Sequence, residues 1–358
     1  MKKIDWYIIK KFLGTFLFSI FLILLIVIVF DISEKIDDFI ENKAPLNSII
    51  FDYYLNFIPY FGNLFIPLFT FIAVIFFTSK MAGNTEIISI LTSGFNFYRF
   101  LFPYILSALI ICVSSFILGN FVIPKTNLDR LEFENKYIKK PYTNRDKNMH
   151  MQINPGDFIY LESYNSHKNI GYKFSMEKFK NGELQKKIYA NYIQWDSSSN
   201  KWNIHNYFTR TFNGLNEEIS QGKKIDTLIN LEPHDFNFRL NNVETMNFFE
   251  LNEFINEERM KGSKNLVYYL IEKHKRIAFP FATIILTIIA VAFSSRKVKG
   301  GLGIHLGIGL LISFSYILFM QFSTTFATNG QLAPGLAVWI PNLIYIVLGS
   351  YLLFKTPK

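Results

Sequence analysis

The run FLGTFLFSIFLILLIVIVF occupies residues 12–30 and carries no charged side chain. An α-helix rises about 1.5 Å per residue, so a run of this length matches the hydrocarbon core of a bilayer, which is about 30 Å thick. Asp31 and Glu34 follow the run in place of the small residues that a signal peptidase needs. We therefore expect residues 12–30 to form a membrane helix that is retained in the protein.

The composition of the whole chain agrees with a membrane protein. Of its 358 residues, 50% are hydrophobic and only 18% are charged, and they include 39 Phe and 19 Tyr. An ordinary soluble enzyme would not expose so much apolar surface to water. Further apolar runs of comparable length cover residues 54–78, 100–123, 277–293, 302–326 and 336–354. The sequence thus predicts six membrane helices, three on each side of a polar middle.

Positive charges mark one side of these runs. Short loops rich in Lys and Arg tend to stay in the cytoplasm, whereas long domains cross the membrane largely regardless of their charge. The net charge of +9 also favours anionic lipid headgroups over nucleic acid as the nearer partner. We expect both termini in the cytoplasm and the polar middle outside the cytoplasmic membrane, because the following cations all fall on one side: Lys2, Lys3, Lys10, Lys11, Lys80, Arg99, Arg296, Lys297, Lys299, Lys355 and Lys358.

The polar middle, residues 125–276, separates a first membrane part, residues 1–124, from a second, residues 277–358. It contains stretches in which apolar and polar residues partly alternate, divided by turn residues such as Asn181-Gly182. This pattern is typical of short antiparallel strands in a sandwich, an open barrel or a jelly roll. The predicted fold is therefore an α-helical membrane protein with six transmembrane helices and an inserted extracytoplasmic all-β, jellyroll-like domain. We expect residues 127–140 and 246–261 to form helical connectors.

Catalytic chemistry has no visible basis in this sequence. The sequence holds no phosphate-binding loop, so we expect any ATP hydrolysis to occur in a separate subunit. The single cysteine, Cys112, and the scattered histidines form no metal-ligand spacing, and we expect neither a metal nor a cofactor. His305 lies near the cytoplasmic end of the fifth run, where an interfacial side chain is the simplest interpretation, and a functional intramembrane group is the alternative.

Small residues open the fifth run. Gly303 and Gly307 form a small-xxx-small pair, which permits close approach of two helices in lipid. We expect this pair to support tight packing within the chain. A movable face against a partner's helix is the alternative.

The connection between the second and third runs contains a short amphipathic stretch. Thr85 can cap the N-terminus of a helix, and Gly94 can end it, so we expect a short cytoplasmic helix at about residues 84–94. The carboxylate of Glu86 on such a helix could form a charge-assisted hydrogen bond to an arginine of a partner. Ile90 and Leu91 could fill an apolar groove on that partner.

The same stretch, EIISILTSG at residues 86–94, resembles the coupling helix of the LptF/LptG family, the permease subunits of the lipopolysaccharide export ABC transporter. DISEKIDDF at residues 31–39 is similar to the end of the family's first helix, and it leans toward LptG over LptF. RKVKGGLGI at residues 296–304 and LAPGLAVWIPN at residues 332–342 resemble the family's fifth and last helices. The order of these motifs covers essentially the whole chain.

The resemblance implies an inner-membrane protein with a periplasmic β-jellyroll. It also implies four partners: a second related permease, a cytoplasmic ATPase dimer, a periplasmic bridge protein and lipopolysaccharide, which the complex extracts from the membrane. By the same resemblance Glu86 matches the acid that approaches the ATPase, and Lys35 matches a first-helix lysine, with Lys43 a looser match. The role expected of these lysines is contact with lipid phosphate, although simple solvation is the alternative and Glu34, Asp37 and Asp38 could neutralise Lys35.

Two other classes of protein are compatible with membrane helices and an external β domain. One is a membrane sensor whose β domain binds a ligand, but the chain carries no cytoplasmic output domain. The other is a lipid-modifying membrane protein, but the apolar runs carry no convergent polar cluster. Both interpretations are weaker than the transporter interpretation.

Overall fold

The computed structural model describes residues 2–138, 147–214, 216–227, 229, 231–236, 240–296 and 301–356. The topology residues Lys297, Lys299 and Lys358 lie outside this set. The chain divides into two compact units, one helical and one containing the β-sheet. The helical unit holds residues 1–139, 243–248 and 267–358, and the second unit holds residues 140–242 and 249–266.

The helical unit contains 6 helices within the described residues that are long and apolar enough to cross a membrane, which confirms the predicted spans. They are longer than the apolar runs, because polar residues at both ends continue the helical hydrogen bonding. The elements in order are α1 (Lys3–Glu41), α2 (Leu46–Ser48) with the π-helix η1 (Ile49–Tyr54) and α3 (Leu55–Gly83), α4 (Glu86–Thr92), α5 (Phe97–Ile117) with the π-helix η2 (Leu118–Val122) and α6 (Ile123–Tyr137), α9 (Leu266–Ser294), α10 (Gly301–Thr328) and α11 (Pro334–Lys355).

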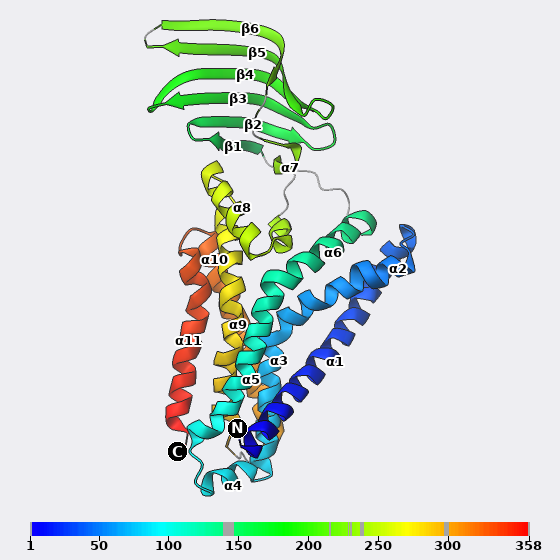
Figure 1. Cartoon of the computed structure of the whole chain (residues 1–358), viewed down its shortest axis with the longest axis vertical. Coiled ribbons are helices and arrows are strands. Elements are labelled where there is room, and N and C mark those ends of the chain that lie inside the picture. The colour runs from blue at the N-terminus through cyan, green and yellow to red at the C-terminus, as the bar shows by residue number, and fades with distance from the viewer. Residues whose placement is uncertain are drawn as a thin grey trace. The chain divides into compact units, whose positions relative to one another are not determined.

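Helix α3 is central to the helical unit and packs against both α1 and α10 (Figure 1). Its apolar side chains Phe71, Val74 and Ile75 are fully buried. The helices differ strongly in how much the rest of the chain covers them. In the most apolar window of each helix, 67% of residues are buried for α9, but only 22% for α10 and 11% for α1. The surfaces of α1 and α10 are therefore left to lipid or to another protein.

Buried polar contacts join the last three membrane helices. The amide of Asn342 on α11 donates to the carbonyl oxygen of Ala278 on α9 at 2.9 Å, and Tyr316 on α10 donates to the amide oxygen of Asn342 at 2.9 Å. Asn342 is fully buried. Lipid tails are as apolar as the helix surfaces, so the hydrophobic effect does not drive membrane helices together. Van der Waals packing and hydrogen bonds such as these hold the helices together instead.

The glycines of α10 behave differently from the expectation. A Cβ at Gly303 or Gly307 would meet no atom within 4 Å, so this pair does not support tight packing within the described chain. Gly309 does, because a Cβ there would lie 2.3 Å from the side chain of Ile75 on α3. The close approach of α10 to α3 thus depends on Gly309, which lies two residues after Gly307 and therefore on nearly the opposite side of the helix.

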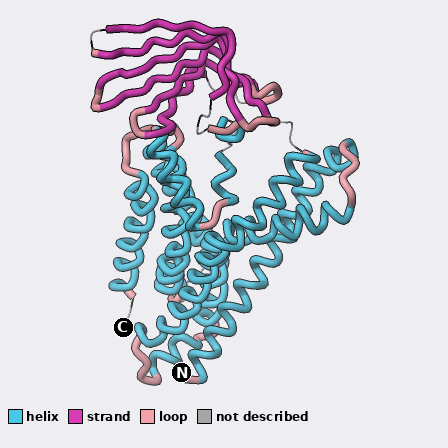
Figure 2. Tube along the Cα trace, turned by 45° about the horizontal axis from the view of Figure 1, so that its top comes forward, coloured by secondary structure: helices cyan, strands magenta, loops and turns pink. Residues whose placement is uncertain are grey.

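The second unit contains one six-stranded antiparallel sheet, which confirms the inserted all-β domain (Figure 2). Each described strand pairs with its neighbour in sequence, and this meander order differs from the Greek keys of a closed jellyroll. The fully buried Trp202 anchors its core and donates its indole N–H to the carbonyl oxygen of Leu231 at 2.8 Å. The strands are β1 (Lys147–Asn154), β2 (Asp157–Asn165), β3 (Ile170–Lys180), β4 (Glu183–Asp196), β5 (Lys201–Asn213) and β6 (Asn216–Thr227).

Short helices follow this sheet in the sequence. They are α7 (Pro233–Phe236), the 3₁₀ helix η3 (Leu240–Thr245) and α8 (Phe248–Lys261). The helical connectors expected at residues 127–140 and 246–261 correspond to α6 and α8.

Candidate functional site

Helix α4 connects α3 to α5 and lies at the same end of the helical unit as the start of α1 and the end of α11 (Figure 1). The short helix predicted at residues 84–94 is present as Glu86–Thr92, and Gly94 follows it with φ +88°. Thr85 is the N-cap residue of α4, as predicted, but its side chain makes no capping hydrogen bond. Thr85 has a left-handed φ of 61°, and its hydroxyl donates instead to the carbonyl oxygen of Asn84 at 2.6 Å.

One face of α4 is buried and one is open. Ile87 is only 2% exposed, and Ile90 and Leu91 are half-buried against the core of their own chain. Ile88 is 53% exposed. The apolar side chain of α4 that is most available to a partner is therefore Ile88, which the sequence interpretation missed, and less so Ile90 and Leu91.

The carboxylate of Glu86 is held at the base of α4 by two donors. The hydroxyl of Tyr7 on α1 donates to Oε2 at 3.4 Å, and the amide of Asn84 donates to Oε1 at 3.1 Å. These groups line a surface pocket of about 460 Å³ together with Lys3 and Ser89. Glu86 is thus half-buried but open to a cation from outside the chain, which is the environment that a partner's arginine would need.

An ion pair that sequence reasoning missed fixes the same end of the unit. Arg99 on α5 donates to the carboxylate of Asp5 on α1 at 2.6 Å, and the Asp5 side chain is 2% exposed. The backbone N–H of Lys2 donates to the same carboxylate at 2.7 Å. Arg99 was expected to serve only as a cytoplasmic topology charge. The pairing spans 94 positions of sequence, so no local pattern could reveal it.

Lys35 lies on the last turns of α1, at the opposite end of that helix from Asp5. Its ammonium group lies 2.6 Å from the carboxylate of Asp31, contacts the hydroxyl of Tyr53 on η1, and lies 4.9 Å from the centre of the Tyr53 ring. Tyr53 and Tyr54 also donate to Asp31, at 3.2 and 3.1 Å. The Lys35 side chain is 21% exposed.

This geometry changes the account of the expected lipid contact. The carboxylate that pairs with Lys35 is Asp31, four residues earlier on the same face of α1, and not one of the neighbouring acids Glu34, Asp37 and Asp38 that the sequence suggested. Lys43 is exposed immediately after α1, with φ 51°. The two lysines that were considered together therefore differ: Lys35 is held in a cluster, and Lys43 is solvent-exposed.

His305 is not a solvated interfacial side chain. It is 2% exposed, its Nδ1 lies 2.6 Å from the hydroxyl oxygen of Ser79 on α3, and its ring meets Phe293 edge-on at 5.2 Å. Its Nε2 is buried and has no partner among the described residues. The contact between His305 and Ser79 joins α10 to α3, the same two helices that pack closely at Gly309.

A polar cavity of about 340 Å³ lies inside the helical unit near η3. It is lined by Asn127, Glu244, Glu272 and Arg276, among others. Arg276 lies 3.2 Å from Glu272 and donates to the backbone carbonyls of residues 243 and 246 at 2.7 and 2.6 Å, which fastens α9 to that segment. Burial and the nearby carboxylate of Glu272 raise the pKa of Glu244 above its ordinary value.

A second arginine, Arg130 on α6, lies 3.7 Å from Glu134 and 4.0 Å from Glu244. Sequence reasoning missed this cluster, because its members come from three segments far apart in the chain. Among the described residues, no group of three or more His, Cys, Asp or Glu side chains could hold a metal ion.

Comparison with known protein families gives one match, to the family described as "Lipopolysaccharide export system permease LptF/LptG", over residues 6–355. A search of curated proteins finds no match. The family match covers both sets of membrane helices and the sheet between them, so it includes α4 and the Lys35 cluster. The chain belongs to the LptF/LptG family of lipopolysaccharide export system permeases.

Proposed function

We propose that this protein is one permease subunit of an ABC transporter that extracts lipopolysaccharide from the inner membrane and passes it to a periplasmic bridge protein. The observation that carries the proposal is the family match over residues 6–355. The multi-pass architecture with an inserted β domain is consistent with it. In this proposal the cytoplasmic ATPase dimer supplies the energy, and the chain itself hydrolyses no nucleotide.

Helix α4 is the proposed contact with the ATPase. Its position beside both ends of the chain agrees with the cluster of positive charges expected on the cytoplasmic side (Figure 1). The exposed Ile88 supplies an apolar anchor, and the half-buried carboxylate of Glu86 can accept a charge-assisted hydrogen bond from a partner's arginine. The Asp5–Arg99 ion pair joins α1 to the start of α5, the helix that follows α4.

A second permease is the proposed occupant of the open helix faces. The faces of α1 and α10 are much less covered than that of α9. Gly303 and Gly307 leave α10 free of side chains at two positions of its open face, which suits close approach of a partner helix. A lipid between two such subunits would meet apolar helix surfaces and the ion pair of Lys35 with Asp31.

The proposal is tested by reconstitution. The chain would be co-expressed with candidate ATPase and permease subunits from the same cell, purified by a tag on this chain, and placed in liposomes containing lipopolysaccharide. We expect the ATPase to co-purify, lipid-stimulated ATP hydrolysis to require both permeases, and the isolated chain to show no hydrolysis. Co-purification without ATP-dependent release of lipopolysaccharide to a soluble acceptor would contradict the proposed transport.

A further inference from the structure

One face of the β-sheet carries a row of aromatic side chains that do not belong to its core. The strand register aligns His150 with Tyr160, Tyr160 with Ser175, Ser175 with Tyr189, and Tyr189 with Phe208 across five strands. Tyr189 is 43% exposed and Phe208 is 37% exposed. Adjacent residues in the same strands, such as Phe174 and Leu161, point to the opposite face and are buried in the core. The aromatic row is therefore a surface feature.

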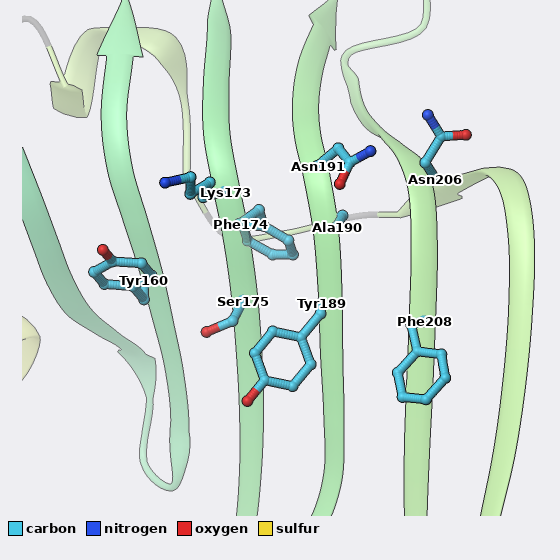
Figure 3. A pocket seen from close by; sticks show the side chains of 9 residues that line it. All are labelled: Tyr160, Lys173, Phe174, Ser175, Tyr189, Ala190, Asn191, Asn206 and Phe208. Carbon is cyan, nitrogen blue, oxygen red and sulfur yellow. The ribbon is translucent and has the colours of Figure 1, made fainter.

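Ser175 interrupts this row and leaves a depression. The resulting pocket of about 410 Å³ is floored by strands β3 and β4 and bordered by the rings of Tyr160, Tyr189 and Phe208 (Figure 3). Its wall at one side is polar and is formed by Lys173, Asn191 and Asn206 (Figure 3).

Backbone irregularities place that polar wall. Lys173 and Asn206 have positive φ values of 50° and 51°, conformations that are uncommon for residues other than glycine. The pairing of residues on either side sets Lys173 opposite Asn191, and Asn191 opposite Asn206. Three neighbouring strands thus present a polar side chain at the same level, directly beside the aromatic row.

The surface around the pocket is close to neutral, because its cations are already paired. Lys173 lies 2.9 Å from Glu162, Lys187 lies 2.5 Å from Glu177, and Arg210 pairs with Glu217. These pairs raise the pKa of Lys173 and Lys187 above the ordinary value for lysine. An anionic ligand would have to displace these carboxylates, so the pocket is better suited to an uncharged partner. The amides of Asn191 and Asn206 are its available hydrogen-bonding groups.

These features select a class of ligand. A pyranose ring has an apolar C–H face that can lie on an aromatic ring and equatorial hydroxyls that can pair with amides at its edge. An acyl chain would need a continuous apolar groove, which the polar wall and Ser175 interrupt. A peptide strand would pair with the edge of a sheet, and this pocket lies on its face.

We propose that this pocket binds an oligosaccharide, namely the sugar portion of the exported lipopolysaccharide. The proposal rests on the proposed function, because that function supplies the lipid that carries the glycan. In this proposal the aromatic row holds the glycan on the surface of the β domain, while the acyl chains are bound elsewhere.

The test uses the full-length chain in detergent micelles and a lipid-free oligosaccharide released from lipopolysaccharide by mild acid. Saturation-transfer difference NMR would report contact with the sugar protons, and a titration would give the affinity. We expect Tyr189→Ala and Phe208→Ala each to weaken binding by about fivefold or more, as expected for loss of a stacked ring. Asn191→Ala should weaken it less. The control is Phe249→Ala, which removes an aromatic ring that is 71% exposed outside the pocket.

Folding of each variant is checked by the fluorescence of Trp195 and Trp202, which lie in the same sheet. Ser175→Phe provides a second test, because it fills the depression without removing an aromatic side chain. Binding that is absent in the wild-type chain, or equal in Tyr189→Ala, Ser175→Phe and the control, would overturn the proposal. Sugar binding requires no ATPase, so a wild-type chain that releases lipopolysaccharide but binds no oligosaccharide would reject only this inference, whereas a wild-type chain that binds oligosaccharide but supports no release would reject only the proposed transport.

Discussion

Helix α1 carries an ion-paired aspartate near each end, one buried and one half-buried, and the two are used in different ways. Asp5 pairs with Arg99, which comes from another membrane helix, and its side chain is 2% exposed. Asp31 pairs with Lys35 on its own helix, one turn away, and its side chain is 11% exposed. The first pair therefore fixes the position of α1 relative to α5, whereas the second fixes a side chain on α1.

The two ion pairs differ in what it costs to remove the cationic side chain from the carboxylate. Removing one partner of a buried pair leaves an uncompensated charge, so the Asp5–Arg99 contact is structurally demanding. Asp31 keeps two tyrosine hydroxyls as donors even when Lys35 moves away. Lys35 can accordingly leave Asp31 at smaller cost than Arg99 can leave Asp5.

The largest effect is expected from breaking the Asp5–Arg99 pair. Arg99→Ala should lower the melting temperature more than the other substitutions, because it leaves the buried carboxylate of Asp5 without its cation. It should also reduce assembly with the ATPase, because the pair joins α1 to the start of α5, the helix that follows α4. Thermal unfolding in detergent measures the first effect and co-purification the second. The exchange Asp5→Arg with Arg99→Asp should restore part of both, and additive losses in that double variant would show that the pair itself contributes nothing.

The second prediction concerns Glu86, which the same end of α1 holds through Tyr7. Glu86→Arg should abolish most of the lipid-stimulated ATP hydrolysis of the complex, because a cation now faces the partner's arginine, while the chain still folds. Tyr7→Phe should have a smaller effect of the same kind. Glu183→Arg, at an exposed hairpin of the β-sheet, is the matched control. Unchanged stimulation in Glu86→Arg would make α4 an ordinary connection between α3 and α5.

These two predictions also mark the limit of what the sequence alone reveals. The six spans and the inserted β domain could be predicted because hydrophobic length and alternation are local properties of the chain. Arg99 could not be distinguished from a topology charge, because its partner lies 94 positions away. The motif formed by Gly303 and Gly307 permits close packing against a helix of the same chain or of another chain, and the sequence does not distinguish the two. In the structure, no described atom of the chain lies within 4 Å of a Cβ built at either glycine. Lys35 was proposed as a site residue from the resemblance, and that role stays a prediction; Tyr53, which contacts Lys35, gave no sequence signal.

The third prediction addresses the exchangeable pair. Lys35→Gln should change the apparent melting temperature little, because a pair of this kind contributes about 1 kcal/mol or less. It should nevertheless slow the release of lipopolysaccharide in the reconstituted transporter. A photocrosslinker at position 35 should capture more lipopolysaccharide than one at Phe21, which is 61% exposed on the apolar surface of α1. Equal capture at both positions, with release unaffected, would remove Lys35 from the lipid path.

The smallest effect is expected at Glu244, whose contact with Arg130 at 4.0 Å is a third and weaker ion pair. Burial and the carboxylate of Glu272 raise the pKa of Glu244 in the folded protein. The protonated Glu244 side chain therefore stabilises the folded protein below the ordinary glutamate pKa of about 4.3, and this stabilisation is lost as the pH rises through the raised pKa. Glu244→Gln should therefore raise the melting temperature slightly at pH 8 and leave it unchanged at pH 4. A lower melting temperature at pH 8 would mean that the attraction of Arg130 outweighs desolvation.

The two π-helical segments, η1 at Ile49–Tyr54 and η2 at Leu118–Val122, set the angular phase of their helices. A π turn accommodates an extra residue within a continuous helix, which is equivalent to a single-residue insertion that the helix absorbs without breaking. Each extra residue rotates everything before it by about 100° relative to everything after it. In η1 this rotation determines whether Tyr53 and Tyr54 face Asp31 or face lipid. Relatives that differ by one residue at these two segments should therefore keep both helices intact and change only which side chains meet α1.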